Sequence, residues 1–294
     1  MKRDLYFSKP LMNAAGTLGF APDPRGLKDL GDLEGFGAFV TNPISLRPRL
    51  PTAQPSLIEY PGGFLLHTGL PNPGFSSVIK KHTARWERSN LPIIVHLMAD
   101  RPEETKHMVQ MLENVENVMA VELGFAPLLA DDIFLITLEM CLGELPLIFS
   151  LPHEQVLSLG PRLIQNGAEA ISLSAPRGAL TASASLPVPA ELVQAAQRPS
   201  PSPKGRGELI TGRLYGRSLF PQALELVHSA ARIGLPIIGA GGVWTEQDLA
   251  DMLSAGAIAV QSDANLWSPR ESSMNGEAIL GTQGKADNQA KIEP

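Results

Sequence analysis

The chain has 294 residues, of which 44% are hydrophobic and 18% are charged, as is usual for a soluble globular protein. Its net charge of -6 gives no bulk electrostatic support for a nucleic-acid partner. The single cysteine, Cys141, excludes an internal disulfide framework and a cysteine-based zinc cluster, and we expect it on a buried helix face.

The start of the chain and its hydropathy indicate a cytoplasmic protein. The first six residues, MKRDLY, contain no apolar signal core. No uninterrupted apolar run approaches the ~18 residues that a membrane span needs. We therefore expect a cytoplasmic location and no membrane partner.

Short apolar runs alternate with longer segments of helical periodicity. The runs are bounded by Gly, Pro or polar residues, which is typical of parallel strands covered on both faces. The predicted strands, in chain order, are Leu11–Ala15, Ala38–Thr41, Pro92–Leu97, Val118–Leu123, Leu145–Leu151, Ala168–Leu173, Pro236–Ala240 and Ala257–Gln261. The predicted helices are Phe75–Arg88, Pro102–Glu113, Gln155–Asn166, Pro221–Ile233 and Glu246–Ala255. Thr245 is a predicted N-cap of the last helix and Gly256 a predicted C-cap.

This alternation favours an α/β fold in which eight strands close a (β/α)8 TIM barrel, rather than an open doubly wound sheet. We expect the barrel over residues 1–267. Residues 197–208, rich in Pro, Ser, Gly and basic residues, are expected to form a low-complexity surface insertion, with a basic binding loop as the alternative. Residues 268–294 are expected to form a polar tail, so the last helix of the barrel is incomplete or a partner chain covers that place.

In this fold, ligands bind where the strands end. The small residues Ala15, Gly16 and Thr17 after the first predicted strand let the backbone approach a flat ligand. Gly241 and Gly242 precede a helix after the seventh predicted strand, an arrangement typical of a phosphate site. For both segments, an ordinary tight turn is the alternative.

Single polar side chains near the strand ends offer further candidates. Asn72 is interpreted either as a ligand contact or as a turn residue before Pro73. Two histidines are candidate bases, with structural roles as the alternative: His67 and His96. Three arginines are candidate anion ligands, with surface solvation as the alternative: Arg47, Arg213 and Arg217.

A set of motifs, in this order, resembles the dihydroorotate dehydrogenase family, class 1-like, from about Leu11 to Trp267. The motifs are PLMNAAGTLGF (10–20), GAFVTNPISLRPR (37–49), PGG (61–63), GLPNPG (69–74), the spacing of Gly216 and Pro221 in YGRSLFP, PIIGAGGV (236–243) and AIAVQ (257–261). The resemblance implies an FMN-dependent oxidoreductase of pyrimidine biosynthesis that converts dihydroorotate to orotate. In that reaction a base removes a proton from C5 and a hydride passes from C6 to flavin N5.

The resemblance also implies which residues would hold each ligand. The FMN-binding residues would be Ala15, Gly16, Thr17, Gly216, Gly241 and Gly242. The substrate-binding residues would be Gly69, Leu70 and Asn72, and no metal is expected.

The chain departs from the family pattern at most of the positions that carry chemistry. Asn42 and Ser150 stand where the family has lysines, and Leu66 and Ser174-Ala175 stand where it has asparagines. The family's fourth strand ends in a motif with Asn and then a catalytic Cys or Ser, and here that stretch is ELGFAP (122–127). Asp263-Ala264 replaces a Gly-Thr pair. The base and the flavin-site cation are therefore missing, and the catalytic residues stay unassigned. A degenerate barrel that binds a small ligand or a partner protein is the second hypothesis, and a homodimer is left open.

Overall fold

A computed structural model describes residues 4–22, 35–52, 56–181, 185–186 and 209–266 of the chain. The predicted insertion at residues 197–208 and the predicted tail at residues 268–294 lie outside the described residues.

Eight parallel strands close into a barrel. They are β1 (Leu11–Asn13), β2 (Phe36–Val40), β5 (Ile93–Met98), β6 (Val118–Gly124), β7 (Leu147–Leu151), β8 (Ala170–Leu173), β12 (Ile237–Ala240) and β13 (Ala259–Ser262). Their order around the barrel is β1-β13-β12-β8-β7-β6-β5-β2, and β1 pairs with β2 to complete the ring. Each predicted strand overlaps one of these eight, so the predicted TIM barrel is confirmed.

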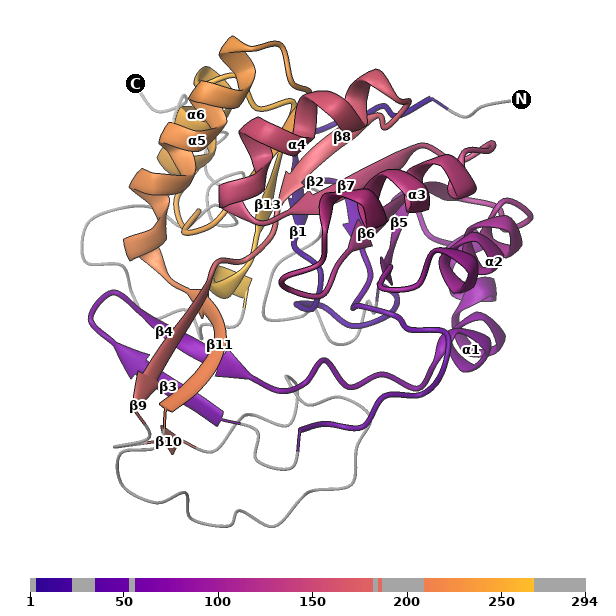
Figure 1. Ribbon diagram of the computed structural model, residues 1–294, viewed down its shortest axis with the longest axis horizontal. Helices are drawn as coiled ribbons and strands as arrows, with labels where there is room; N and C mark the ends of the chain where they lie inside the picture. The colour runs from indigo at the N-terminus through magenta and orange to yellow at the C-terminus, as the bar shows by residue number, and fades with distance from the viewer. Residues whose placement is uncertain (1–3, 23–34, 53–55, 182–184, 187–208, 267–294) are drawn as a thin grey trace, which may run out of the picture.

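Six described α-helices lie outside the barrel, as Figure 1 shows. They are α1 (Phe75–Glu87), α2 (Pro102–Leu112), α3 (Asp131–Cys141), α4 (His153–Gln165), α5 (Phe220–Arg232) and α6 (Glu246–Ser254). The five predicted helices are among them, while α3 was foreseen only as the buried helix face that carries Cys141. Thr245 caps α6 in a capping box with Asp248, and Gly256 follows the helix at a φ of 106°.

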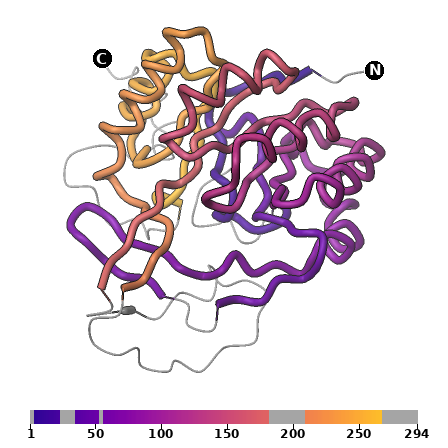
Figure 2. Tube along the Cα trace, viewed as in Figure 1, coloured from indigo at the N-terminus to yellow at the C-terminus, as the bar shows by residue number. Residues whose placement is uncertain are grey.

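A second sheet, which the sequence did not predict, stands at the end of the barrel where the strands finish (Figure 1, Figure 2). Its five strands run in the order β10-β3-β4-β11-β9. They are β3 (Ser56–Tyr60), β4 (Gly63–His67), β9 (Arg177–Thr181), β10 (Ser185–Leu186) and β11 (Leu209–Tyr215). Because they belong to the connections that follow β2 and β8, they extend from the ligand-binding end that a TIM barrel offers.

The apolar core has two main parts. One part fills the space between the barrel and the helices, and the other fills the inside of the barrel with residues such as Ile94, Ile148 and Ile238. Side chains alternate between the two faces of a strand, so the residue two positions further along also points inward. On β5 and β6 that step leads from Ile94 to His96 and from Ala120 to Glu122, where the apolar filling gives way to polar groups.

Candidate functional site at the mouth of the barrel

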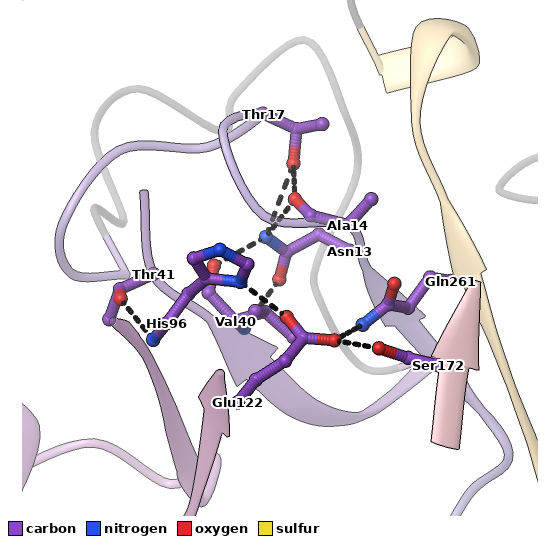
Figure 3. Close-up of polar contacts among 9 residues, drawn as sticks. All are labelled: Asn13, Ala14, Thr17, Val40, Thr41, His96, Glu122, Ser172 and Gln261. Atoms are coloured by element: carbon purple, nitrogen blue, oxygen red, sulfur yellow. Dashed lines mark hydrogen bonds and ion pairs between the residues drawn. The ribbon is translucent and has the colours of Figure 1, made fainter. Parts of the chain in front are cut away.

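Four polar side chains form the floor of the barrel mouth: His96, Glu122, Ser172 and Gln261, here called the polar floor (Figure 3). Glu122 is 1% exposed, and its Oε2 accepts a hydrogen bond from Nδ1 of His96 at 2.7 Å. Its Oε1 accepts from Ser172 Oγ at 2.6 Å and from Gln261 Nε2 at 2.8 Å. Burial alone would raise the pKa of the Glu122 carboxyl, but the hydrogen bond and charge of His96, with the two other donors, lower it. Glu122 is therefore an ionised carboxylate inside the barrel.

His96 is held by its backbone and by one ring nitrogen. Its backbone N–H donates to Thr41 Oγ1 at 3.0 Å, and its Nδ1 hydrogen is fixed on Glu122, because an ionised carboxylate can only accept. Nε2 makes no hydrogen bond to a described residue, and Figure 3 shows it turned away from Glu122. The side chain keeps 9% of its surface exposed. Nε2 of His96 therefore faces the mouth without a hydrogen-bond partner among the described residues.

Gly124 makes room for this imidazole. A Cβ atom at position 124 would collide with His96 Nε2 and Cε1. The His96 ring therefore packs against the backbone of Gly124, which no larger residue could replace without moving the ring.

The turn after β1 is held by its own hydrogen bonds. Asn13 Nδ2 donates to Val40 O at 2.7 Å, while Val40 N donates to Asn13 Oδ1 at 2.9 Å. Thr17 Oγ1 donates to Ala14 O at 2.6 Å, which leaves Thr17 turned into the protein (Figure 3). Of the predicted FMN-binding residues here, Gly16 needs its lack of a side chain because its φ is 93°.

The predicted phosphate loop has the expected glycine geometry. Gly241 and Gly242 follow β12 with φ angles of 104° and 71°. A Cβ at Gly242 would lie 2.6 Å from the backbone nitrogen of Phe220, and one at Gly216 would collide with Gly62 O. The structure therefore brings the three predicted glycines of this group into one tightly packed region.

A carboxylate stands at the same loop. Ala240 pairs with Gln261, and two residues beyond each of them stand Gly242 and Asp263. Asp263 is 4% exposed, and its Oδ1 accepts the backbone N–H of Ala264. Burial raises the pKa of Asp263 from 3.8 to about 6, although the backbone hydrogen bonds act in the opposite direction. The carboxylate has no ion-pair partner among the described residues.

Asn72, a predicted substrate contact, is occupied within the protein. Its Oδ1 accepts hydrogen bonds from Ser45 N at 3.2 Å, Ser45 Oγ at 3.1 Å and Gly74 N at 3.0 Å. Its Nδ2 donates to Leu70 O at 3.3 Å, and the side chain is 2% exposed. These contacts correspond to the turn role that was the alternative from the sequence. The neighbouring Gly69 and Leu70 both adopt positive φ angles, 78° and 55°, so this turn is tightly specified.

The other candidates from the sequence are spread around the rim. His67 Nε2 lies 3.2 Å from Thr52 Oγ1, so it is engaged on the antiparallel sheet and does not join the polar floor. Arg217 lies 5.4 Å from the ring centre of Trp244, a cation–π contact. Arg47 is exposed, and Arg213 lies on β11.

Sequence reasoning missed two groups at the strand ends. The sequence placed Glu122 only within a predicted strand. A carboxylate in the apolar run Val118–Leu123 nevertheless indicates a buried charge, which needs an ion-pair or hydrogen-bond partner. His153 begins α4 directly after β7, and both of its ring nitrogens are buried without a hydrogen-bond partner in the described structure. Burial lowers the pKa of His153, so this imidazole is neutral.

Two hollows are open on the described surface. A cavity of about 520 Å³ lies between α5 and α6 on the outside, away from the strand ends. A cavity of about 360 Å³ lies next to the phosphate loop, between the β3–β4 hairpin, Gly216, Arg217 and Trp244. Only the second adjoins the end of the barrel where ligands bind, and its size is within the range of small-molecule sites.

The chain is a TIM barrel with a polar floor and a glycine loop at its strand ends, which is the end where barrels of this fold bind their ligands. The family model described as dihydroorotate dehydrogenase matches residues 3–125. The chain is 30% identical over 274 residues to the dihydroorotate dehydrogenase B (NAD(+)) catalytic subunit of Pelobacter propionicus, covering 87% of this chain and 83% of the relative. It belongs to the dihydroorotate dehydrogenase family.

Further comparisons agree with this assignment. The subunit of the same name from Trichlorobacter lovleyi is 28% identical over 302 residues, covering 96% of this chain and 93% of the relative. The crystal structure of an Eimeria tenella dihydroorotate dehydrogenase in complex with ferulenol has a TM-score of 0.64 at 16% identity, covering 90% of this chain and 77% of that one. The structural likeness concerns the fold.

The residues at the strand ends do not fit the flavin that the family pattern implied. A phosphate at the glycine loop would meet the buried Asp263 carboxylate, whose Oδ1 already takes the Ala264 N–H. None of the described residues that end the eight barrel strands, or directly follow them, is Lys or Arg. The reduced flavin would carry negative charge, and none of these strand-end residues supplies a lysine or arginine to balance it.

Proposed function

We propose that this chain is a small-ligand-binding member of the dihydroorotate dehydrogenase family that does not oxidise dihydroorotate with FMN. The observation that carries the proposal is the Asp263 carboxylate in the phosphate loop, buried and hydrogen-bonded to the Ala264 N–H. Like charges repel more strongly in a buried place than in water. The loop is therefore suited to a neutral or cationic group and not to a phosphate dianion.

The polar floor gives the ligand its other contact. His96 Nε2 is free of protein partners in the described structure, and Glu122 fixes the Nδ1 hydrogen. A ligand group that donates a hydrogen bond suits Nε2. Ser150, the residue that replaces the family lysine, is 8% exposed and adds a neutral hydroxyl at the end of β7. The proposed ligand is thus small, polar and not phosphorylated at the end that enters the barrel.

The test is turnover. The purified full chain is incubated with FMN, dihydroorotate and a dye that accepts electrons, and orotate is followed by its absorbance. The Pelobacter propionicus protein, whose name states that activity, runs in parallel as the positive control. We expect no orotate above the rate without protein. Formation of orotate that depends on both the chain and FMN would refute the proposal.

The role in protein interaction, the homodimer and the cytoplasmic location stay predictions. None of the helices in the described part of the chain is long and apolar enough to cross a membrane.

A further inference from the structure

Two arginines lie directly opposite each other on the antiparallel sheet. In the register of β9 and β11, Arg177 pairs with Arg213. The backbone N–H of Leu214 donates to Pro176 O at 2.8 Å, so the ladder hydrogen bonds flank the arginine pair instead of joining it. In such a non-hydrogen-bonded pair, the Cα atoms are about 4.5 Å apart and the side chains are at their closest. The two arginine side chains therefore leave the sheet next to each other, on the same face.

The part of this face around the arginine pair is accessible to solvent. Arg177 is exposed and Arg213 is half-buried. The opposite face is packed, with Ile58, Leu65 and Ile210 each no more than 5% exposed. The guanidinium groups are thus on the side that a solute can reach.

The pair carries two positive charges, and no carboxylate of a described residue forms an ion pair with either of them. Neither Arg177 nor Arg213 takes part in an ion pair or a side-chain hydrogen bond with a described residue; the ion pairs of the described structure lie elsewhere. Like charges directly opposite each other destabilise a sheet. Burial, and to a smaller extent the charge of Arg213, lowers the pKa of Arg177. An anion placed between the two groups would remove the repulsion between them.

The pair is also near the strand ends of the barrel. Arg177 follows the end of β8 at Leu173 by four residues, so at most about 14 Å of chain separates them. Tyr215 lies two residues beyond Arg213 on the same face, and the charges of both Arg213 and Asp263 act on the pKa of its hydroxyl.

We propose that Arg177 and Arg213 together bind a small-molecule anion through a carboxylate or phosphate group. Guanidinium groups present planar pairs of N–H donors that match the oxygens of both anions. The site is on the antiparallel sheet, outside the glycine loop, so it does not depend on the proposed function.

Calorimetric titration of the full chain with inorganic phosphate, and separately with malonate, tests the site. We expect saturable binding of at least one probe, and the stronger response tells phosphate from carboxylate recognition. Arg213→Gln and Arg177→Gln should each weaken binding by about tenfold or more, because each removes charge-assisted hydrogen bonds. Arg232→Gln, at an exposed arginine on the outer helix α5, is the matched control and should leave the affinity within about twofold.

Melting temperatures without added anion show that each variant is folded, and Arg177→Gln should melt no lower than the parent. Equal affinity in all four proteins, or no saturable binding of either probe, would overturn the inference. The two proposals can fail separately. FMN-dependent formation of orotate would refute the proposed function without affecting the anion titration, and a failed anion titration would leave the turnover result unaffected.

Discussion

Replacing Asp263 by asparagine is expected to stabilise the protein at neutral pH and to have little effect in acid. Burial raises the pKa of this carboxyl from 3.8 to about 6 in the folded protein. Between those two pH values the folded state binds more protons than the unfolded state, so stability falls as the pH rises through that window. The shift of roughly 2 pH units corresponds to about 3 kcal/mol at pH 7, since each unit is worth about 1.4 kcal/mol.

Asparagine avoids that cost and keeps an oxygen for the Ala264 N–H. Urea unfolding of the parent and of Asp263→Asn, at about pH 4 and about pH 7, measures the difference. The variant should gain up to about 3 kcal/mol at the higher pH and almost nothing at the lower one. Asp4→Asn, at an exposed position, is the control and should show no gain at either pH. A gain of the same size at both pH values, or a loss at pH 7, would refute the reasoning.

Three further predictions concern other buried groups. Because His96→Leu leaves the ionised Glu122 without its main partner, it should lower the free energy of unfolding in urea by about 3 kcal/mol. The double variant His96→Leu/Glu122→Leu should recover most of that loss. An equal loss in the single and the double variant would contradict the buried pair. Burial raises the pKa of Cys141 to about 12, so Ellman's reagent should react with it only on unfolding, and rapid labelling of the folded protein would disprove this. Burial lowers the pKa of His82 to about 4, so the free energy of unfolding should decrease as the pH drops from 6.5 to 4. In His82→Phe this decrease should be smaller over the same pH range. The same decrease in the variant and the parent would contradict the prediction.

The barrel was predictable because its strands are buried on both faces. Such strands are continuous apolar runs, and the strand from Leu147 to Leu151 is an example in which every residue is buried. The antiparallel sheet was not predictable in the same way. Its β4 and β11 strands pair Leu65 with Leu214 across a long stretch of sequence, and β11 contains Gly212 and Arg213, which interrupt any apolar pattern. Local sequence carries little information about such distant pairing.

The candidate site was predictable in part. The glycines at 241 and 242 predicted a tight turn after β12, and their positive φ angles agree with such a turn, whereas the phosphate site predicted there stays a prediction. Asp263 was identified from the sequence only as a departure from the family's Gly-Thr pair, and the fold adds that its carboxylate is buried and accepts the Ala264 N–H. The His96–Glu122 contact joins neighbouring strands whose register places the two residues opposite each other. That register follows from the closed barrel and not from either strand alone.

The most direct test of the central claim is equilibrium dialysis of the purified full chain against FMN. If the buried Asp263 carboxylate and the absence of a strand-end cation in the described barrel exclude the flavin, the protein should be colourless as purified. The FMN concentration should then be equal on both sides of the membrane. Retention of FMN at one flavin per chain, with the shifted absorbance of a bound flavin, would contradict the account.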